Sequence, residues 1–327
     1  FHFVRDAIKN DIKPIVGCEF FLCHDRNDKS YKDDGFQTVL IAKNRNGYKN
    51  LIKLASYANI EGFYYVPRID REILLEYKED LIALTGGIWG EVPNKILFEG
   101  KQKAEEALLW WKEHFGDDFY IELNRHGIEE ENEINKVLLE FASAHNIKYI
   151  ACNNTYYVDK DDAESHDVLL CIRDAKHVSQ PKKYIGKRGR EFRFGFPNDE
   201  FYVKSADEMR KLFADLPDAI HTTNEIADKV EPFELERDVL LPKFDIPDEF
   251  KDERDLADDS LKIGENNYLR HITYEGAKNR YSEVSPEISE RLDFELEVIK
   301  NTGYPGYFLI VEDFIREARN MGVSVGP

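Results

Sequence analysis

The segment "IKYIACNNTYY" (147–157) changes from an apolar run to polar residues within a few positions. A short apolar run that ends at a polar turn is typical of a buried strand. The carboxyl ends of parallel strands are where α/β proteins usually carry their functional sites, so Asn154 and Tyr156 stand where a site is expected. Both side chains are neutral, however, and they are weak metal ligands and poor general bases.

The first half of the chain repeats this pattern and alternates it with amphipathic helical segments. Each predicted strand is short and apolar and precedes a polar or glycine-containing turn. Strands are predicted at 13–22, 36–44, 80–87, 118–127 and 147–154, and helices at 46–59, 70–78, 100–116 and 129–146. The alternation predicts an α/β domain made of repeated βα units around a parallel sheet or barrel.

From about residue 160 the pattern becomes mainly helical. A proline-punctuated acidic segment at 240–255 indicates a domain boundary. We therefore predict one domain over residues 1–250 and a second, mostly helical one over residues 251–327. Helices are predicted at 162–178, at 205–230 (two helices, with Ser205 as an N-cap and a break at Pro217), and at 258–281, 285–302 and 307–321.

The composition narrows the class of protein. The chain has 327 residues, a formal charge of −19 and 42% hydrophobic residues, which supports a sizeable core and argues against disorder of the whole. The negative charge argues against a general nucleic-acid-binding surface but leaves room for a locally basic face. No apolar run is long enough to span a membrane and no signal peptide is found, so we expect a cytoplasmic protein without a membrane partner. The four cysteines match no zinc spacing, and we expect reduced, mostly buried thiols at Cys18, Cys23, Cys152 and Cys171.

Seven segments carry a more specific signal. In chain order they are "KPIVGCEFFL" (13–22), "LIAKNRNGYKNLIKLAS" (40–56), "YVPRIDREIL" (65–74), "LIALTGG" (81–87), "FYIELNRHG" (119–127), "HDVLLCIRDAK" (166–176) and "TGYPGYFLIVEDFI" (302–315), the last followed by "GVSVGP" (322–327). Together these segments resemble the N-terminal part of the bacterial DNA polymerase III alpha subunits, the C-family replicative polymerases. The resemblance covers nearly the whole chain.

The resemblance implies a particular fold. The first domain would be a polymerase-and-histidinol-phosphatase (PHP) domain, a distorted, TIM-like βα barrel of seven strands with a metal cluster at the carboxyl ends of its strands. The second would be the mostly helical beginning of the polymerase palm. The family's first strand carries His-x-His followed by an Asp-His-Gly turn, and neither occurs at the start of this sequence. We therefore expect the N-terminal strand, the first metal motifs and the catalytic aspartates of the palm to be missing from this chain.

The remaining metal positions of the family fall on five residues of this sequence. Glu19 and His126 match metal-ligating positions and keep good donor atoms. Gln37 stands where metal-binding members tend to have His, and Asn154 and Tyr156 align with an Asp-x-His pair. An amide and a phenol do not compensate cation charge, so these three changes predict a degenerate metal site. Without the resemblance, Glu19 would be read as a solvent-facing or ion-paired residue.

Other residues have a proposed role that does not involve the cluster. His166, which begins a predicted helix, is interpreted as structural or interdomain. Gly326 would begin a loop whose backbone amides face the phosphates of the incoming nucleotide. The basic, aromatic-containing segment 182–194 could contact nucleic acid, although such loops are more often only solvated. The candidate DNA-contacting residues are Lys182, Lys183, Lys187, Arg188 and Arg190.

The function implied by the resemblance is DNA-directed DNA synthesis by the parent protein, a nucleotidyltransferase that uses Mg²⁺. Its expected partners are DNA, dNTP, a proofreading exonuclease subunit, the sliding clamp and other replisome subunits. The PHP domain itself is expected to be structural and to lack Zn²⁺ or Mn²⁺. Two alternatives stay open: a metal-dependent 3′-5′ exonuclease or phosphoesterase built on Glu19 and His126, and a scaffold for protein interaction only.

Overall fold

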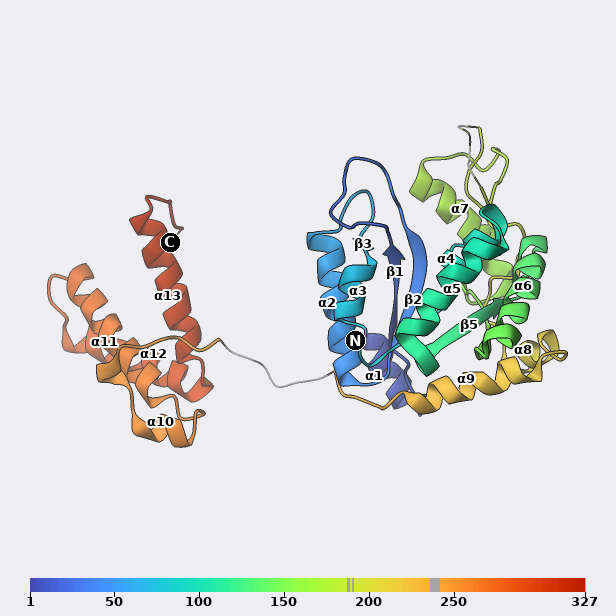
Figure 1. Cartoon of the computed structure of the whole chain (residues 1–327). Helices are drawn as coiled ribbons and strands as arrows, with labels where there is room; N and C mark the ends of the chain where they lie inside the picture. The colour runs from blue at the N-terminus through green and yellow to red at the C-terminus, as the bar shows by residue number, and fades with distance from the viewer. Residues whose placement is uncertain (187–188, 190, 236–241, 327) are drawn as a thin grey trace. The chain divides into compact units, whose positions relative to one another are not determined.

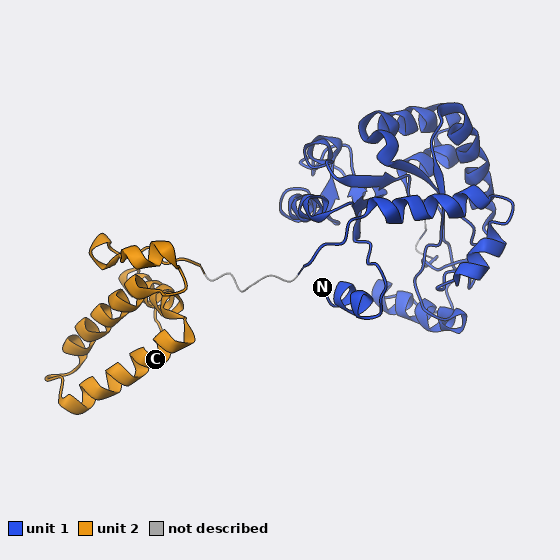
Figure 2. Cartoon of the chain, turned by 90° about the horizontal axis from the view of Figure 1, so that it is seen from below, with its two compact units in different colours: residues 1–235 blue, residues 236–327 orange. Residues whose placement is uncertain are grey.

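The computed structural model describes residues 1–186, 189, 191–235 and 242–326. The chain divides into two compact units, residues 1–235 and 236–327 (Figure 2). This division lies fifteen residues before the boundary expected after residue 250. The assignment of a PHP domain to residues 1–250 and of a palm to residues 251–327 stays a prediction.

Unit 1 contains a six-stranded mixed sheet in the order β3-β1-β2-β4-β5-β6. The strands are β1 (Gly17–Leu22), β2 (Phe36–Ala42), β3 (Arg68–Ile69), β4 (Leu81–Leu84), β5 (Phe119–Asn124) and β6 (Tyr149–Cys152). The α/β class is confirmed, and the described residues contribute six strands where the resemblance implied seven. The expectation of repeated βα units around a parallel sheet was wrong for β2, which runs antiparallel to both β1 and β4. The physical reason is the connection 23–35, which contains no helix that could carry the chain back to a parallel start.

Helices cover the sheet and connect its strands (Figure 1). Their ends follow local capping chemistry: Asn44 caps α2, Asp70 caps α3, and Pro217 begins α9 at its first turn. Ser205 is the N-cap of α8, as expected, and also forms a capping box with Glu208. The α-helices of unit 1 are α1 (His2–Lys9), α2 (Arg45–Ile60), α3 (Arg71–Glu76), α4 (Glu91–Phe98), α5 (Lys101–Phe115), α6 (Glu129–His145), α7 (Ala163–Asp174), α8 (Ala206–Leu212) and α9 (Pro217–Lys229). Short 3₁₀ turns occur at Gly116–Asp118 and Lys160–Asp162. The sequence did not predict β3 or α4.

The two faces of the sheet pack differently. On β5, Phe119, Ile121 and Leu123 belong to the large core that also contains residues of α2, α3, α5 and α6. Tyr120 points to the opposite face and joins a smaller apolar cluster with Ile82, Leu84, Ile150 and Ile226 of α9. Helix α9, which contacts β6, thus covers the apolar part of this second face. The remaining part of the second face carries polar side chains.

Unit 2 is helical, as expected. Its α-helices are α10 (Glu253–Ala257), α11 (Ile263–Arg280), α12 (Pro286–Thr302) and α13 (Pro305–Asn320), preceded by a 3₁₀ turn at Asp248–Phe250. The helix expected from residue 258 begins only at Ile263, because the Asp255 carboxylate accepts hydrogen bonds from the amides of Ile263 and Gly264. Gly303 ends α12 in a left-handed conformation at φ 78°. Across the described ranges of both units, no helix has the length and apolarity that crossing a membrane requires.

Candidate functional site at the carboxyl edge of the sheet

Strand direction places three of the predicted metal positions near one edge of the sheet, whereas Glu19 lies within a strand. β1, β3, β4, β5 and β6 all point the same way, so their carboxyl ends lie together with the amino end of β2. Gln37 lies at the start of β2, His126 two residues after β5, and Asn154 two residues after β6. Glu19 lies in the middle of β1, opposite Val39 of β2.

The second face of the sheet also carries a carboxylate that the sequence did not predict. Glu122 lies on the same face of β5 as Tyr120 and Asn124, and it is buried. The Asn124 amide donates to Glu122 Oε1 at 2.7 Å, and the Glu122 backbone amide donates to Thr85 Oγ1 at 2.9 Å. Burial raises the pKa of Glu122, and the nearby negative charge of Glu19 raises it further. This carboxyl therefore favours its protonated form more than an ordinary glutamate does.

His126 is held in one orientation by three contacts. Its ring is buried and stacks on Phe201 with centroids 4.3 Å apart. Its Nδ1 lies 2.7 Å from Glu131 Oε1, and its backbone amide donates to Glu131 Oε2 at 2.6 Å. The carboxylate beside Nδ1 and the backbone amide fixes the orientation of the ring and leaves Nε2 outside that contact. Nε2 is buried and has no hydrogen-bond partner among the described residues.

Asn154 and Tyr156 contact each other and an aromatic cluster. The Asn154 amide donates to the Tyr156 hydroxyl at 3.5 Å. The Tyr156 ring packs beside Phe196 and Phe201, with centroid distances of 4.6 and 6.1 Å. Burial raises the pKa of Tyr156, so its phenol stays neutral at physiological pH. The pair therefore offers neutral hydrogen-bonding groups at the edge of the sheet.

The donor set does not fit a zinc or manganese cluster. Within the described part of the chain, no three His, Cys, Asp or Glu side chains converge as metal ligands. Glu19 is exposed overall. Partial burial of its carboxyl group nevertheless raises the pKa of that group. Besides Glu19 and His126, the predicted positions contribute amides and a phenol, which bind such ions poorly. The assignment of these five residues to an inherited metal site stays a prediction.

The basic segment is partly bound within the fold. Lys182 Nζ lies 3.2 Å from Asp167 Oδ1, and Lys183 lies over the Phe192 ring. Lys187, Arg188 and Arg190 lie outside the described residues. Gly326 follows α13 in an irregular segment. Their roles in binding DNA or nucleotide stay predictions.

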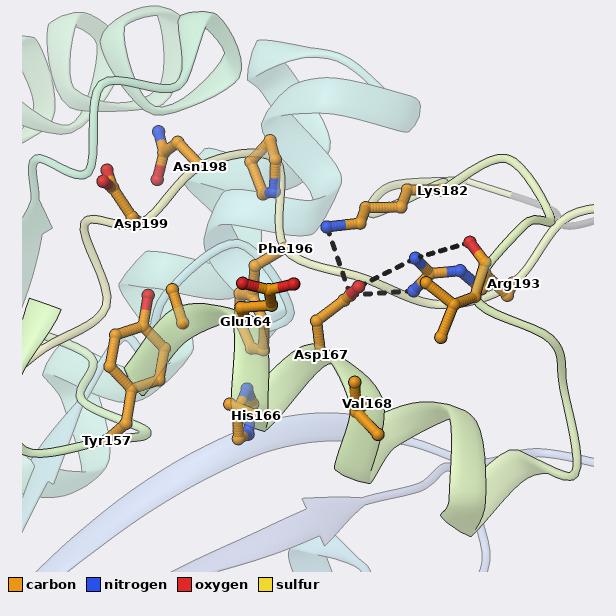
Figure 3. A pocket seen from close by; sticks show the side chains of 13 residues that line it. Tyr157, Glu164, His166, Asp167, Val168, Lys182, Arg193, Phe196, Asn198 and Asp199 are labelled. Carbon is orange, nitrogen blue, oxygen red and sulfur yellow. Dashed lines mark hydrogen bonds and ion pairs between the residues drawn. The ribbon is translucent and has the colours of Figure 1, made fainter. Parts of the chain in front are cut away.

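A pocket of about 500 Å³, here named the α7 pocket, lies between α7 and the segment 178–199 (Figure 3). His166 is one of its lining residues and stands 5.8 Å, between ring centroids, from Tyr156. The pocket is lined by Tyr157, Ala163, Glu164, His166, Asp167, Val168, Val178, Lys182, Arg193, Phe196, Pro197, Asn198 and Asp199. It therefore adjoins the predicted site through shared aromatic contacts.

The sequence did not predict two residues of the site, Glu122 and Glu131, and the reasons differ. Glu122 had a visible signal, because the alternation of Tyr120, Glu122 and Asn124 in a predicted strand puts three polar side chains on one face. Glu131 had none, because its bond to His126 crosses from a loop into the first turn of α6.

Comparison with known proteins relates both units to one family. A profile described as "PHP domain" matches residues 1–126, and one described as "Bacterial DNA polymerase III alpha NTPase domain" matches residues 267–327. The chain is 38% identical to the DNA polymerase III subunit alpha of Borreliella burgdorferi, over 99% of this chain and 27% of that protein. It is 35% identical to those of Treponema pallidum and Thermus aquaticus, over 100% and 99% of this chain and 26% and 30% of those proteins.

The chain thus spans between a quarter and a third of the length of these relatives, and the matched identity extends across both units. It belongs to the family of bacterial DNA polymerase III alpha subunits and carries a PHP domain at residues 1–126.

Proposed function

We propose that this chain is part of a replicative DNA polymerase alpha subunit, in which its PHP domain supports the fold and binds protein partners. The proposal rests on the side chains that this chain has at the metal-binding positions of the family. The ligand positions Gln37, Asn154 and Tyr156 hold neutral groups, and Tyr156 packs into an aromatic cluster. A cleft of this kind does not supply the negative charge that two or more divalent ions need.

The catalytic activity proposed for the parent protein is DNA-directed DNA synthesis with Mg²⁺ as cofactor. When bound, Mg²⁺ would align the primer hydroxyl and the dNTP. The residues for that chemistry are not predicted within residues 1–327, which would contribute Gly326 to the nucleotide-phosphate loop. DNA, dNTP, a proofreading exonuclease, the sliding clamp and other replisome subunits are the proposed partners, and the cytoplasm is the proposed location.

Primer extension tests the polymerase assignment. The complete gene product that contains this chain should extend a primed template with dNTPs and Mg²⁺, while residues 1–327 alone should not. A complete gene product that is folded and monodisperse but cannot extend the primer would refute the assignment. Extension by residues 1–327 alone would show that the catalytic residues had been placed wrongly.

A metal-dependent 3′-5′ exonuclease or phosphoesterase remains the second candidate, because one observation favours it. The His126–Glu131 pair has the arrangement found behind metal-ligating histidines, and His126 Nε2 has no hydrogen-bond partner in the part of the chain that the structure describes. This candidate predicts hydrolysis of single-stranded DNA or of a phosphate monoester that Zn²⁺ or Mn²⁺ stimulates and a chelator abolishes. Our proposal predicts no such activity, and a His126→Ala variant would separate true hydrolysis from a contaminating nuclease.

A further inference from the structure

The α7 pocket has two chemically different sides (Figure 3). In the figure, Lys182, Asp167 and Arg193 lie on one side of Glu164, and Tyr157 and Asp199 lie on the other.

The two cations on the basic side of the pocket are both paired with Asp167. The two terminal nitrogens of Arg193 donate to the two oxygens of Asp167 at 2.8 Å each, and Lys182 Nζ lies 3.2 Å from Asp167 Oδ1. The Arg193 guanidinium also donates to the carbonyls of Gln180 and Val178. A phosphate bound on this side would have to compete with Asp167 for both cations, so this side is poorly suited to nucleic acid.

The other side of the pocket presents unpaired negative charge beside aromatic rings. Glu164 has no hydrogen bond or ion pair with any described residue, and Asp199 Oδ1 lies 3.5 Å from Lys160 Nζ. The His166 ring stands 5.4 Å from both the Tyr157 and the Phe196 ring, between centroids, and only 9% of Tyr157 is exposed.

An apolar stripe continues from the pocket along α7. Val168 lines the pocket, and Leu169 and Ile172 follow at the spacing that places side chains on one side of a helix. Leu169 is 59% exposed and Ile172 is 71% exposed. Large apolar side chains gathered on one side of a surface helix are typical of a protein-binding surface.

We propose that the α7 pocket receives the guanidinium group of an arginine from a protein partner, whose neighbouring apolar residues lie on Val168, Leu169 and Ile172. A planar guanidinium can stack on aromatic rings while it pairs with a carboxylate, which matches the Glu164 side of the pocket. The negative charges of Glu164 and Asp199 disfavour a nucleic-acid backbone at this side of the pocket. This inference adds a partner chemistry to the docking role proposed above for the PHP domain.

Peptide titration of the isotope-labelled 327-residue chain, followed by NMR, tests this inference. The probe is a blocked tripeptide of one arginine and two leucines, and the matched probe replaces arginine with glutamate. The arginine peptide should bind about fivefold more tightly or better, which is the order that a cation–π contact and one carboxylate pair provide. The shifted amide signals should come from α7 and residues 196–199.

Two variants locate the binding. Glu164→Gln should weaken the arginine peptide about threefold, and Ile172→Ser should weaken both peptides. Glu133→Gln is the matched control, because Glu133 is an exposed residue of α6 far along the chain from α7 and should change nothing.

Three results would overturn the inference: equal affinity for the two peptides, no saturable shift at α7 up to about 10 mM peptide, or binding of a short oligothymidylate at α7 instead. None of these results would bear on whether the cleft binds metal. The docking inference and the proposed loss of the metal site can therefore fail separately.

Discussion

Replacing Asp167 with asparagine should destabilise unit 1 by about 2–4 kcal/mol, because it removes the charge that compensates a buried guanidinium. The Arg193 side chain is 3% exposed and that of Asp167 is 14% exposed, and two bonds of 2.8 Å join them. Breaking a fully buried pair costs about 3–5 kcal/mol, and the partial exposure of Asp167 together with the acceptor that asparagine retains lowers that figure. For a unit of this size the loss corresponds to a decrease in Tm of roughly 5–12 °C.

Calorimetry or circular dichroism of the full chain at neutral pH would measure this decrease. Lys182→Ala is the matched control, since the Lys182 side chain is 46% exposed and its pairing with Asp167 should contribute about 1 kcal/mol or less. The Arg193 hydrogen bonds lower the pKa of Asp167, so its stabilising effect is present above the ordinary pKa near ~4 and is lost as the pH falls through the lower folded value. The difference between wild type and Asp167→Asn should therefore shrink below about pH 4. Equal destabilisation by the two variants at neutral pH would refute this account of the pair.

Three further substitutions are expected to change stability, each measurable by urea unfolding. Gly62→Ala should cost about 2 kcal/mol or more, because the added Cβ would stand 1.9 Å from the carbonyl oxygen of Arg68; an unchanged midpoint would contradict this. Gly276→Ala, in α11 with nothing within 4 Å of the new Cβ, should stabilise its unit by about 0.5–1 kcal/mol, and a loss of stability would count against the position of that helix. Glu91→Gln should cost about 2–3 kcal/mol, because the buried carboxylate pairs with Arg71 at 2.8 Å; a cost below about 0.5 kcal/mol would show that the pair contributes little.

The order of strands and helices could be predicted from the sequence, but parts of the sheet could not. Alternating apolar runs and amphipathic segments identify β1, β2, β4, β5 and β6 because burial dictates their composition. A two-residue strand such as β3 leaves no periodic signal. The direction of β2 is also invisible in its own residues, since an apolar run looks the same whichever way it pairs. Its antiparallel pairing follows only from the helix-free connection before it.

The residues of the candidate site could also be predicted only in part. The resemblance named Glu19 and His126 by position, and the alternation along β5 contained enough information to find Glu122. Periodicity could not predict that Glu131 would hold His126, because that contact depends on how the loop after β5 turns into α6. The α7 pocket could not be predicted from periodicity, since Glu164 and Asp199 are thirty-five positions apart in the sequence and yet line the same pocket.

Titration of Zn²⁺ and Mn²⁺ into the metal-free chain tests the central claim most directly. Isothermal calorimetry, with elemental analysis of the dialysed complex, should find less than about one tightly bound ion per wild-type chain, because three of the five predicted ligand positions carry a neutral amide or phenol. The matched variant Gln37→His, Asn154→Asp, Tyr156→His restores three ligands, two imidazoles and one carboxylate, and should bind with higher affinity. Two or more tightly bound ions in the wild-type chain, lost on His126→Ala, would contradict the account and favour a metal-dependent hydrolase.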